Sequence, residues 1–384
     1  MKKREYCGNR PAKLRFMIID FFVDLIVNIF GSKKNQSYVV PQKVLLFNYG
    51  HLGDMLMMGY IINALKIKHS TVEIHLVAGR WCRILIENNP LYDKVFYLDH
   101  FQNNRQSISF LNKYFRHFKD SFSVIKSLRK ENYSHSFDFR YSAYNANQLL
   151  PFLKINQKNG FGTRGLGGLL DNEYFLLKNG VHTIDVQAQG LKNIDVDIES
   201  RSIKPVITIK DETYQLEQLS SEYIIIFPEA GNSNKMLLTN HWEAICQSLL
   251  NHQPDIQLVI CGLTKFSIQL FHNLSHKYGH KIVDASRNLS IPQIIRLLKN
   301  SKGAITLDSF PAHLAASQTQ TLCLFKNGSG SEYFPINSFP TYIIHDHKFS
   351  KTVDTFRDKM TIDYVENFDD SSLGYDWISK MSLL

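Results

Sequence analysis

The stretch that decides the fold reads Ala304-Ile305-Thr306-Leu307-Asp308-Ser309-Phe310-Pro311-Ala312-His313-Leu314-Ala315-Ala316. Its first four residues predict a buried strand, and Pro311, with Ser309 just before it, predicts that a short helix begins at Pro311. Backbone amides at such a helix N-terminus lie at the carboxyl end of the strand, where they can bind an anion such as a pyrophosphate. An ordinary capped helix would have the same sequence, so the function of this segment depends on the rest of the chain.

Short apolar runs alternate with amphipathic segments along most of the chain, which is typical of parallel sheets covered on both faces. The expected strands are 43–49, 72–78, 94–98, 136–141, 223–227, 257–261, 304–307 and 321–325. The expected helices are 54–69, 80–88, 106–130, 144–153, 241–251, 265–278, 291–300, 311–317 and 371–381.

A region of weak periodicity and clustered glycines at residues 159–201 predicts an interdomain segment. We therefore predict an α/β protein with two doubly wound, Rossmann-like domains that face a cleft. The expected divisions are a basic N-terminal segment with an amphipathic helix over 1–40, a domain over 41–200 and a second domain over 201–384.

Composition narrows the classes of partner. The chain has 384 residues and a formal charge of +9, with much of the excess near the N-terminus. A basic surface suits nucleic acid, an anionic membrane or a phosphorylated substrate, but no zinc spacing, RNP pattern or basic-region heptad supports nucleic acid. The five cysteines are widely spaced and form no CxxC, so we expect reduced thiols and a cytoplasmic protein.

The most hydrophobic stretch covers residues 16–30. Asp20, Asp24 and Asn28 recur every four residues, so they form one polar stripe on an otherwise apolar helix. The stretch is too short and too charged to span a bilayer comfortably, and no signal-peptide cleavage site follows it. Two interpretations remain open: the helix lies in a membrane interface, or it packs on the protein itself.

Two further polar loops follow expected strands. Gly50-His51-Leu52-Gly53-Asp54 has glycines that permit a tight turn, and Asp54 is placed at the start of the next helix. The loop over residues 228–235, with the sequence Pro-Glu-Ala-Gly-Asn-Ser-Asn-Lys, occupies the corresponding position in the second half. Its last residue, Lys235, is a cation that can neutralise a phosphate oxygen. Taken singly, Asp54 is a common helix-start carboxylate and Lys235 a common solvated lysine.

Together these segments resemble glycosyltransferase family nine, the heptosyltransferases that build the lipopolysaccharide inner core. The resemblance covers about residues 43–338 and rests on four matches. They are the strand–Leu-Gly-Asp–helix opening at 52–54, the Asn-Asn-Pro-Leu-Tyr-Asp-Lys-Val stretch at 88–95, the series Pro228, Lys235 and Trp242, and Asp-Ser-x-Pro-x-His-Leu-Ala-Ala at 308–316.

The resemblance implies a GT-B enzyme with an acceptor-side N-terminal domain and a nucleotide-sugar domain at the C-terminus. Asp54 would be the catalytic base and Lys235 would steady the donor diphosphate. The remaining donor-binding residues would be Gly53, Asn232, Ser233, Asp308, Ser309, Phe310, Ala312 and His313. The family inverts configuration and uses no metal or cofactor, only a nucleotide diphosphate sugar as co-substrate, so the partners would be that sugar and a saccharide or glycolipid acceptor such as lipopolysaccharide core. Such an acceptor and the basic N-terminus together predict peripheral contact with the inner face of the cytoplasmic membrane.

The chain departs from the family pattern at three places. Phe310 replaces a glycine, Lys235 is followed by Met-Leu-Leu where the family has x-Trp-Pro, and the expected ribose-binding Glu is absent from residues 261–265. The resemblance therefore implies a nucleotide sugar without fixing ADP or heptose. Three alternatives stay open: a non-catalytic binding or assembly protein, a sugar-nucleotide epimerase, and metal binding by the Asp195-Val196-Asp197 pattern.

Overall fold

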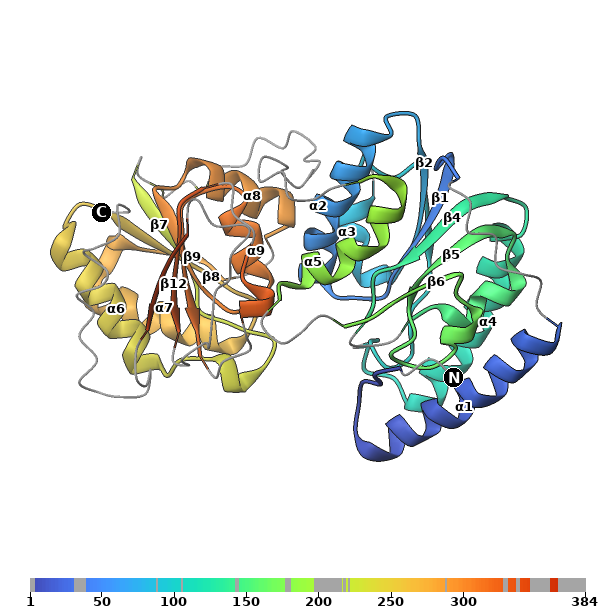
Figure 1. Cartoon of the computed structure of the whole chain (residues 1–384). Helices are drawn as coiled ribbons and strands as arrows, with labels where there is room; N and C mark the ends of the chain where they lie inside the picture. The colour runs from blue at the N-terminus through green and yellow to red at the C-terminus, as the bar shows by residue number, and fades with distance from the viewer. Residues whose placement is uncertain are drawn as a thin grey trace. The chain divides into compact units, whose positions relative to one another are not determined.

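The structure is a computed structural model that describes residues 4–30, 39–87, 89–104, 106–141, 145–176, 181–196, 216, 219, 222–286, 289–326, 331–335, 339–345 and 360–364. The chain divides into two compact units, Met1–Thr208 and Ile209–Leu384, here called the N-terminal unit and the C-terminal unit. Each unit is a parallel sheet with helices on both faces (Figure 1). This confirms the α/β class and the doubly wound architecture predicted from the alternating pattern.

The N-terminal sheet has the strand order β3-β2-β1-β4-β5-β6 in the described residues. Its strands are β1 (Lys43–Asn48), β2 (Glu73–Ala78), β3 (Lys94–Tyr97), β4 (Tyr133–Asp138), β5 (Ile155–Phe161) and β6 (Asn172–Tyr174). All neighbouring pairs are parallel. Because β1 connects to β2 on one side and pairs with β4 on the other, the strand order reverses between β1 and β4.

Helices α2 (Leu52–Lys68), α3 (Arg83–Ile86) and α5 (Thr183–Ala188) lie on one face of this sheet, and α4 (Phe110–Leu128) lies on the other (Figure 1). Leu45 and Phe47 of β1 pack with Val124 and Leu128 of α4. Helix α2 is apolar on all sides because it is buried between the sheet and its neighbours. These contacts fix the carboxyl end of β1, where the first candidate loop begins.

The region that the sequence indicated as an interdomain segment, 159–201, was wrongly interpreted. Part of β5, all of β6, α5 and the one-turn helix η4 (Gln189–Ile194) lie there, within the N-terminal unit. The glycines form a seat for the first helix, α1 (Arg10–Phe30): a side chain at Gly168 would meet Asp24 Oδ1 at 2.5 Å. The cluster therefore reflects close packing of α1 rather than a linker.

The C-terminal sheet has the order β13-β12-β11-β10-β7-β8-β9 in the described residues. Its strands are β7 (Tyr223–Phe227), β8 (Gln257–Cys261), β9 (Ile282–Ala285), β10 (Gly303–Leu307), β11 (Thr321–Phe325), β12 (Thr341–His345) and β13 (Met360–Tyr364). All pairs are again parallel. The strand order reverses between β7 and β10, which is the position equivalent to β1 and β4 in the N-terminal sheet.

Helices α6 (Thr239–His252) and α7 (Lys265–Tyr278) cover one face of the C-terminal sheet, and α8 (Ile291–Asn300) and α9 (Phe310–Ala316) cover the other (Figure 1). Trp242 of α6 is fully buried in the core with Ile226 and Leu258. On the opposite face Ala312 of α9 packs with Cys323 and Phe325. The expected helix at 371–381 lies outside the described residues.

None of the helices formed by the described residues has both the length and the hydropathy needed to cross a membrane. All five cysteines are free thiols, and four of them are buried. Burial raises the pKa of Cys261 and Cys323 to about 12, so both thiols stay protonated at neutral pH.

Candidate active site

Each unit brings polar residues together where its strand order reverses. In a doubly wound sheet the loops that leave the carboxyl ends of the two strands at this point separate, and ligands bind in the space between them. In the N-terminal unit these loops carry Asp54 and Arg140. In the C-terminal unit they carry Lys235 and Asp308. The two sets are described separately below.

Asp54 lies in the first turn of α2 and makes two contacts. Its Oδ2 accepts a hydrogen bond of 2.8 Å from the backbone N–H of His51, and its Oδ1 forms a 2.7 Å ion pair with Nη1 of Arg140. The first contact is the helix-start role that the sequence suggested. The second was not predicted, and it fixes the carboxylate at the carboxyl edge of the sheet with part of its surface open to solvent.

The loop before Asp54 is held tightly. The Gly50 N–H donates to the side-chain oxygen of Asn48 at 2.8 Å, and the Gly50 carbonyl accepts from Nε1 of Trp81 at 2.8 Å. A side chain at Gly50 would place its Cβ 2.5 Å from Cβ of Asp54, so only glycine fits without moving the carboxylate. Gly53 is half-buried in the first turn of α2.

A second carboxylate, Asp138, lies at the end of β4, two residues before Arg140. It accepts backbone hydrogen bonds from Arg140 at 2.9 Å and from Ala146 at 2.5 Å. Burial raises the pKa of Asp138 to about 7, against the opposing effect of these hydrogen bonds and of the Arg140 charge. Asp138 shapes the turn that places Arg140 beside Asp54.

In the C-terminal unit Nζ of Lys235 lies 2.6 Å from Oδ2 of Asp308. Burial raises the pKa of Asp308, and the hydrogen bond from Lys235 opposes that rise. An ammonium group has three N–H donors, and the bond to Asp308 uses one, so Lys235 can also donate to an anion. The pair joins the loop after β7 to the loop after β10, as their common place in the fold predicts.

Glu229, in the loop after β7, caps helix α7. Its carboxylate accepts backbone hydrogen bonds from Leu263 and Thr264, both at 3.0 Å, and it contacts the hydroxyl of Ser267. Burial alone would raise the pKa of Glu229, but the hydrogen bonds from Ser267, Leu263 and Thr264 outweigh it and hold the pKa below its usual value. Glu229 therefore occupies the anion-binding position at the start of α7.

The start of α9 offers fewer amides than its sequence suggested. Pro311 has no N–H, and the N–H of Ala312 already donates to the Ser309 carbonyl at 3.0 Å. The Ser309 hydroxyl lies 3.3 Å from the Glu229 carbonyl and does not cap the helix. Phe310 is half-buried and His313 is buried within the helix. Because α9 has only seven residues, Lys235 carries most of the positive charge at this site.

The remaining donor candidates, Asn232 and Ser233, lie on the exposed part of the loop after β7. Asn232 begins a single 3-10 turn, η5 (Ser233–Lys235), by accepting a hydrogen bond from the Asn234 amide at 3.1 Å. This turn directs Lys235 toward Asp308. Lys265, which follows the place of the missing ribose-binding Glu, is exposed on the first turn of α7.

The Asp195-Val196-Asp197 pattern shows only its first two residues. Asp195 ends η4 in a left-handed conformation and Val196 is buried, while Asp197 lies outside the described residues. Within the described parts of the chain, no three His, Cys, Asp or Glu side chains are grouped so that they could hold a metal ion.

Comparison with known proteins agrees with the resemblance to glycosyltransferase family nine. The model of glycosyltransferase family 9 (heptosyltransferase) matches residues 121–357, more than half of the chain. The chain belongs to glycosyltransferase family 9. This family 9 chain is a glycosyltransferase, as the four matching segments predicted. Among curated proteins, none matches its sequence.

Solved structures confirm the fold. A family 9 glycosyl transferase from Veillonella parvula superposes with a TM-score of 0.67 at 13% identity, over 83% of this chain and 90% of that one. E. coli heptosyltransferase WaaC with ADP gives a TM-score of 0.65 at 11% identity, over 88% and 98%. The E. coli ADP-heptose lps heptosyltransferase II gives 0.61 at 16% identity, over 86% and 95%.

Sequence reasoning missed three residues of the candidate site: Arg140, Asp138 and Glu229. The first two lie in Phe137-Asp138-Phe139-Arg140, where charged residues alternate with aromatic ones at the end of a strand. That pattern was a usable signal, because buried charges at a strand's carboxyl end are uncommon outside sites. Glu229 gave no comparable signal, since its partners lie more than thirty residues away in the sequence.

Proposed function

We propose that this glycosyltransferase moves a sugar, heptose being one candidate, from a nucleotide diphosphate sugar to a hydroxyl of a saccharide acceptor such as lipopolysaccharide core. The observation that carries the proposal is the pairing of charged residues at equivalent strand reversals, Asp54 with Arg140 and Lys235 with Asp308. One set supplies a base and the other a cation for a leaving diphosphate. Among the structural relatives, WaaC was solved with ADP, and the second E. coli enzyme is an ADP-heptose lps heptosyltransferase.

The reaction we propose is a single displacement with inversion. Asp54 takes the proton from the acceptor hydroxyl, and that oxygen forms a bond to the anomeric carbon as the bond to the diphosphate breaks. Lys235 donates to the departing diphosphate, with the backbone amides of Ser309 and Phe310 as further donors. Gly53, Asn232, Ser233, Ala312 and His313 shape the loops that present these groups.

Neither a metal nor a resident cofactor enters the step, because Lys235 takes the part of a divalent cation on the diphosphate. Arg140 holds Asp54 in place through its ion pair. Free cysteines are typical of a reducing compartment, so we propose that the protein is cytoplasmic. Because a lipopolysaccharide-type acceptor is anchored in a membrane, we also propose peripheral contact with the inner face of the cytoplasmic membrane.

A nucleotide panel tests the proposal. The thermal unfolding temperature should rise with one of ADP, GDP, UDP or CMP, equally with and without EDTA. Incubation of the matching nucleotide sugar with candidate acceptors should then give a product whose anomeric configuration, read by NMR, is opposite to that of the donor. A retained configuration, or activity that EDTA abolishes, would contradict the mechanism. A changed sugar formed without acceptor would indicate an epimerase.

A further inference from the structure

Helix α1 is mounted with its apolar side facing outward. Nine large apolar side chains of this 21-residue helix are between 47% and 80% exposed, among them Ile18, Phe22, Ile26 and Ile29. The side chains that face the protein include Phe16, Asp20, Val23 and Asp24. Because residues two apart differ by about 200° around a helix, Ile18 and Phe22 point away from the side that carries Asp20. A helix that served only to pack on its own unit would be turned the other way.

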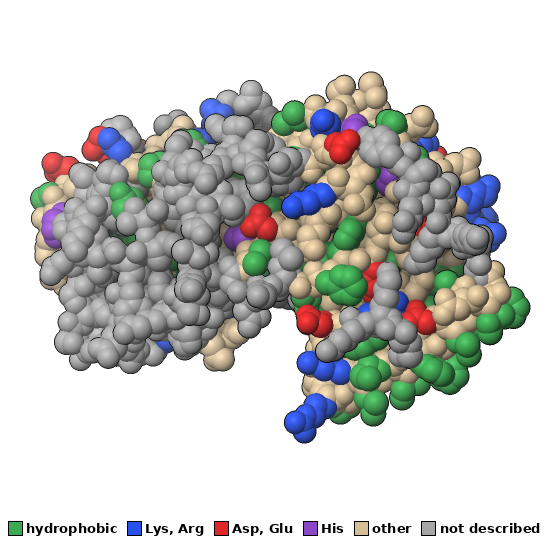
Figure 2. Space-filling view, in the orientation of Figure 1, with side chains coloured by type: hydrophobic (Ala, Val, Ile, Leu, Met, Phe, Trp, Pro, Cys, Tyr) green, Lys and Arg blue, Asp and Glu red, His purple; other side chains and the backbone are tan. Residues whose placement is uncertain are grey.

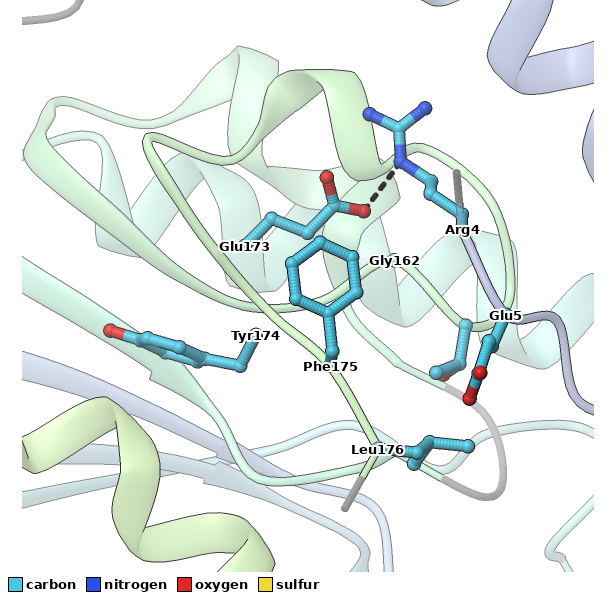
Figure 3. A pocket seen from close by; sticks show the side chains of 8 residues that line it. Arg4, Glu5, Gly162, Glu173, Tyr174, Phe175 and Leu176 are labelled. Carbon is cyan, nitrogen blue, oxygen red and sulfur yellow. Dashed lines mark hydrogen bonds and ion pairs between the residues drawn. The ribbon is translucent and has the colours of Figure 1, made fainter. Parts of the chain in front are cut away.

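A buried arginine holds the helix in this orientation. Nη1 and Nη2 of Arg4 donate to Asp24 at 2.7 Å and 3.0 Å, and Nε donates to Glu173 of β6 at 2.5 Å. Figure 3 shows the Arg4–Glu173 bond beside Phe175. Asp20 lies 3.6 Å from Arg4 and accepts from the hydroxyl of Tyr6 at 2.9 Å. Burial alone would lower the pKa of Arg4, but the bonds to Asp24 and Glu173 outweigh it and raise the pKa.

The glycine seat makes the orientation specific. A side chain at Gly167 would lie 2.5 Å from Nε of Arg4, and one at Gly165, whose φ is +82°, would lie 3.4 Å from the ring of Phe16. The polar side of α1 therefore fits its seat closely. Rolling the helix to bury its apolar side would break the ion pairs of Arg4 with Asp20 and Asp24, so these contacts keep the apolar face exposed.

The charges on α1 indicate what covers this face. Both acidic residues of the helix, Asp20 and Asp24, are bound on its inner side, while Arg10, Lys13 and Arg15 are exposed. Figure 2 shows apolar side chains along the lower right edge, where α1 lies, with basic side chains at the end where the helix begins. A second copy of this face would bring no acidic partner to these cations. Anionic lipid headgroups would supply one, and the acyl region would bury the apolar side chains.

We propose that α1 is a membrane-docking helix that lies in the interface of an anionic bilayer. Its apolar face would insert into the bilayer, and its opposite side would stay attached to the N-terminal unit through Arg4. This proposal rests on the proposed function only for the membrane location, which it explains by a named helix. Binding to a lipid vesicle needs neither donor nor acceptor. Its outcome is therefore independent of whether the transferase assay succeeds.

The test is flotation of the full-length protein with vesicles of phosphatidylcholine alone or mixed with phosphatidylglycerol. Wild-type protein should float with the anionic vesicles and release in high salt. The variant Phe22→Ser/Ile26→Ser/Ile29→Ser should bind about a hundredfold more weakly. Its matched control, Ile67→Ser/Ile84→Ser, removes exposed apolar side chains from α2 and α3 and should bind like wild type. The variant Arg10→Gln/Lys13→Gln/Arg15→Gln should lose at least about tenfold on anionic vesicles only.

Folding is checked in each variant by circular dichroism and thermal unfolding, and these exposed substitutions should leave both unchanged. Insertion is checked with Phe22→Trp, whose fluorescence should shift to the blue on adding anionic vesicles, against Ile84→Trp, which should not shift. Undiminished vesicle binding by the triple serine variant would overturn the proposal. A wild-type dimer that the same variant converts to monomers, with no vesicle binding by either protein, would also overturn it and assign the face to a second copy.

Discussion

The Arg4 network permits a quantitative prediction about the N-terminal unit. The Arg4 side chain is 5% exposed and bridges Asp20, Asp24 and Glu173, of which Asp20 and Glu173 are almost fully buried. Arg4→Met leaves these carboxylates without their cation. Breaking a buried ion pair by removing one partner costs about 3–5 kcal/mol, so we expect a loss of that size in the unfolding free energy of the N-terminal unit.

Arg80→Met is the matched control. Arg80 also bridges two carboxylates, Asp99 at 3.2 Å and Asp120 at 2.7 Å, but its side chain is 47% exposed. Solvent screens the exposed Arg80 charge, and the buried Asp99 keeps its 2.6 Å hydrogen bond from the backbone N–H of residue 80, so the loss should cost less than about 1 kcal/mol. Adding Asp24→Asn and Glu173→Gln to Arg4→Met should recover at least half of the lost stability, because the unpaired charges are then removed.

The pH dependence follows from the direction of the Asp20 shift. Burial raises the pKa of Asp20 even beside Arg4. A carboxyl whose folded pKa exceeds its unfolded value lowers stability at high pH, and the cost disappears as pH falls through the folded pKa. Without Arg4 this pKa rises further, so the deficit of Arg4→Met should be largest above the folded pKa of Asp20 and should shrink as pH falls through it.

The assay is pulse-labelling hydrogen exchange at increasing urea concentrations, read on peptides from residues 10–30 and 155–176 so that only the N-terminal unit is followed. Equal losses for Arg4→Met and Arg80→Met would refute the reasoning. So would a deficit that does not change with pH.

Three further changes give separate tests. A folded pKa of about 7 for Asp138 means that the unfolding free energy of the wild type falls between about pH 4 and pH 7, by up to about 4 kcal/mol. Asp138→Asn should remove this fall, which urea titrations at several pH values measure. Parallel curves of unfolding free energy against pH for the two proteins would contradict the prediction. Gly50→Ala forces Asp54 to move and should lower kcat at least about tenfold while nucleotide affinity, measured by calorimetry, stays the same; an unchanged kcat would show that the loop tolerates a side chain. Glu229→Gln should destabilise α7 by about 1–2 kcal/mol, seen as faster hydrogen exchange over residues 263–270; unchanged exchange would exclude its capping role.

Much of the fold was predictable because most strands are short apolar runs. Strands β7 and β8 and helices α7 and α8 begin and end where the sequence predicted them. Strand β5 escaped notice because its sequence is polar: Asn159 is buried and donates to the Ser136 carbonyl at 2.9 Å while accepting from Asn172. Hydrogen bonds satisfy these side chains, and a hydrophobic pattern cannot reveal that.

Other differences have equally local causes. Strand β9 follows α7 after one short turn, and its four residues were not predicted as a strand. The expected helix at 144–153 is a 3-10 helix over Asn147–Phe152, and Pro151 inside it prevents a regular α-helix. Strands β12 and β13 were not predicted from the sequence.

The candidate site divides in the same way. Asp54 and Lys235 were predicted because polar loops after strands are visible in a sequence and match the family's motifs. Their partners Arg140 and Asp308 lie 86 and 73 residues away, and which side chains meet depends on the strand order of each sheet. The sequence could not predict which face of α1 is exposed, because a polar stripe can either face solvent or pair with polar groups of the protein.

The central claim is that Asp54 supplies the base and Lys235 the diphosphate contact. The most direct test is the rate of nucleoside diphosphate release from the donor identified by the nucleotide panel, measured with acceptor for wild type, Asp54→Asn and Lys235→Met, alongside calorimetric binding of that nucleotide. We predict that Asp54→Asn lowers kcat by about 10²–10⁴ and leaves nucleotide affinity unchanged, while Lys235→Met weakens nucleotide affinity at least about tenfold. Asp308→Asn, which keeps Lys235, should retain that affinity. Full turnover by Asp54→Asn, or unchanged nucleotide binding by Lys235→Met, would contradict the account.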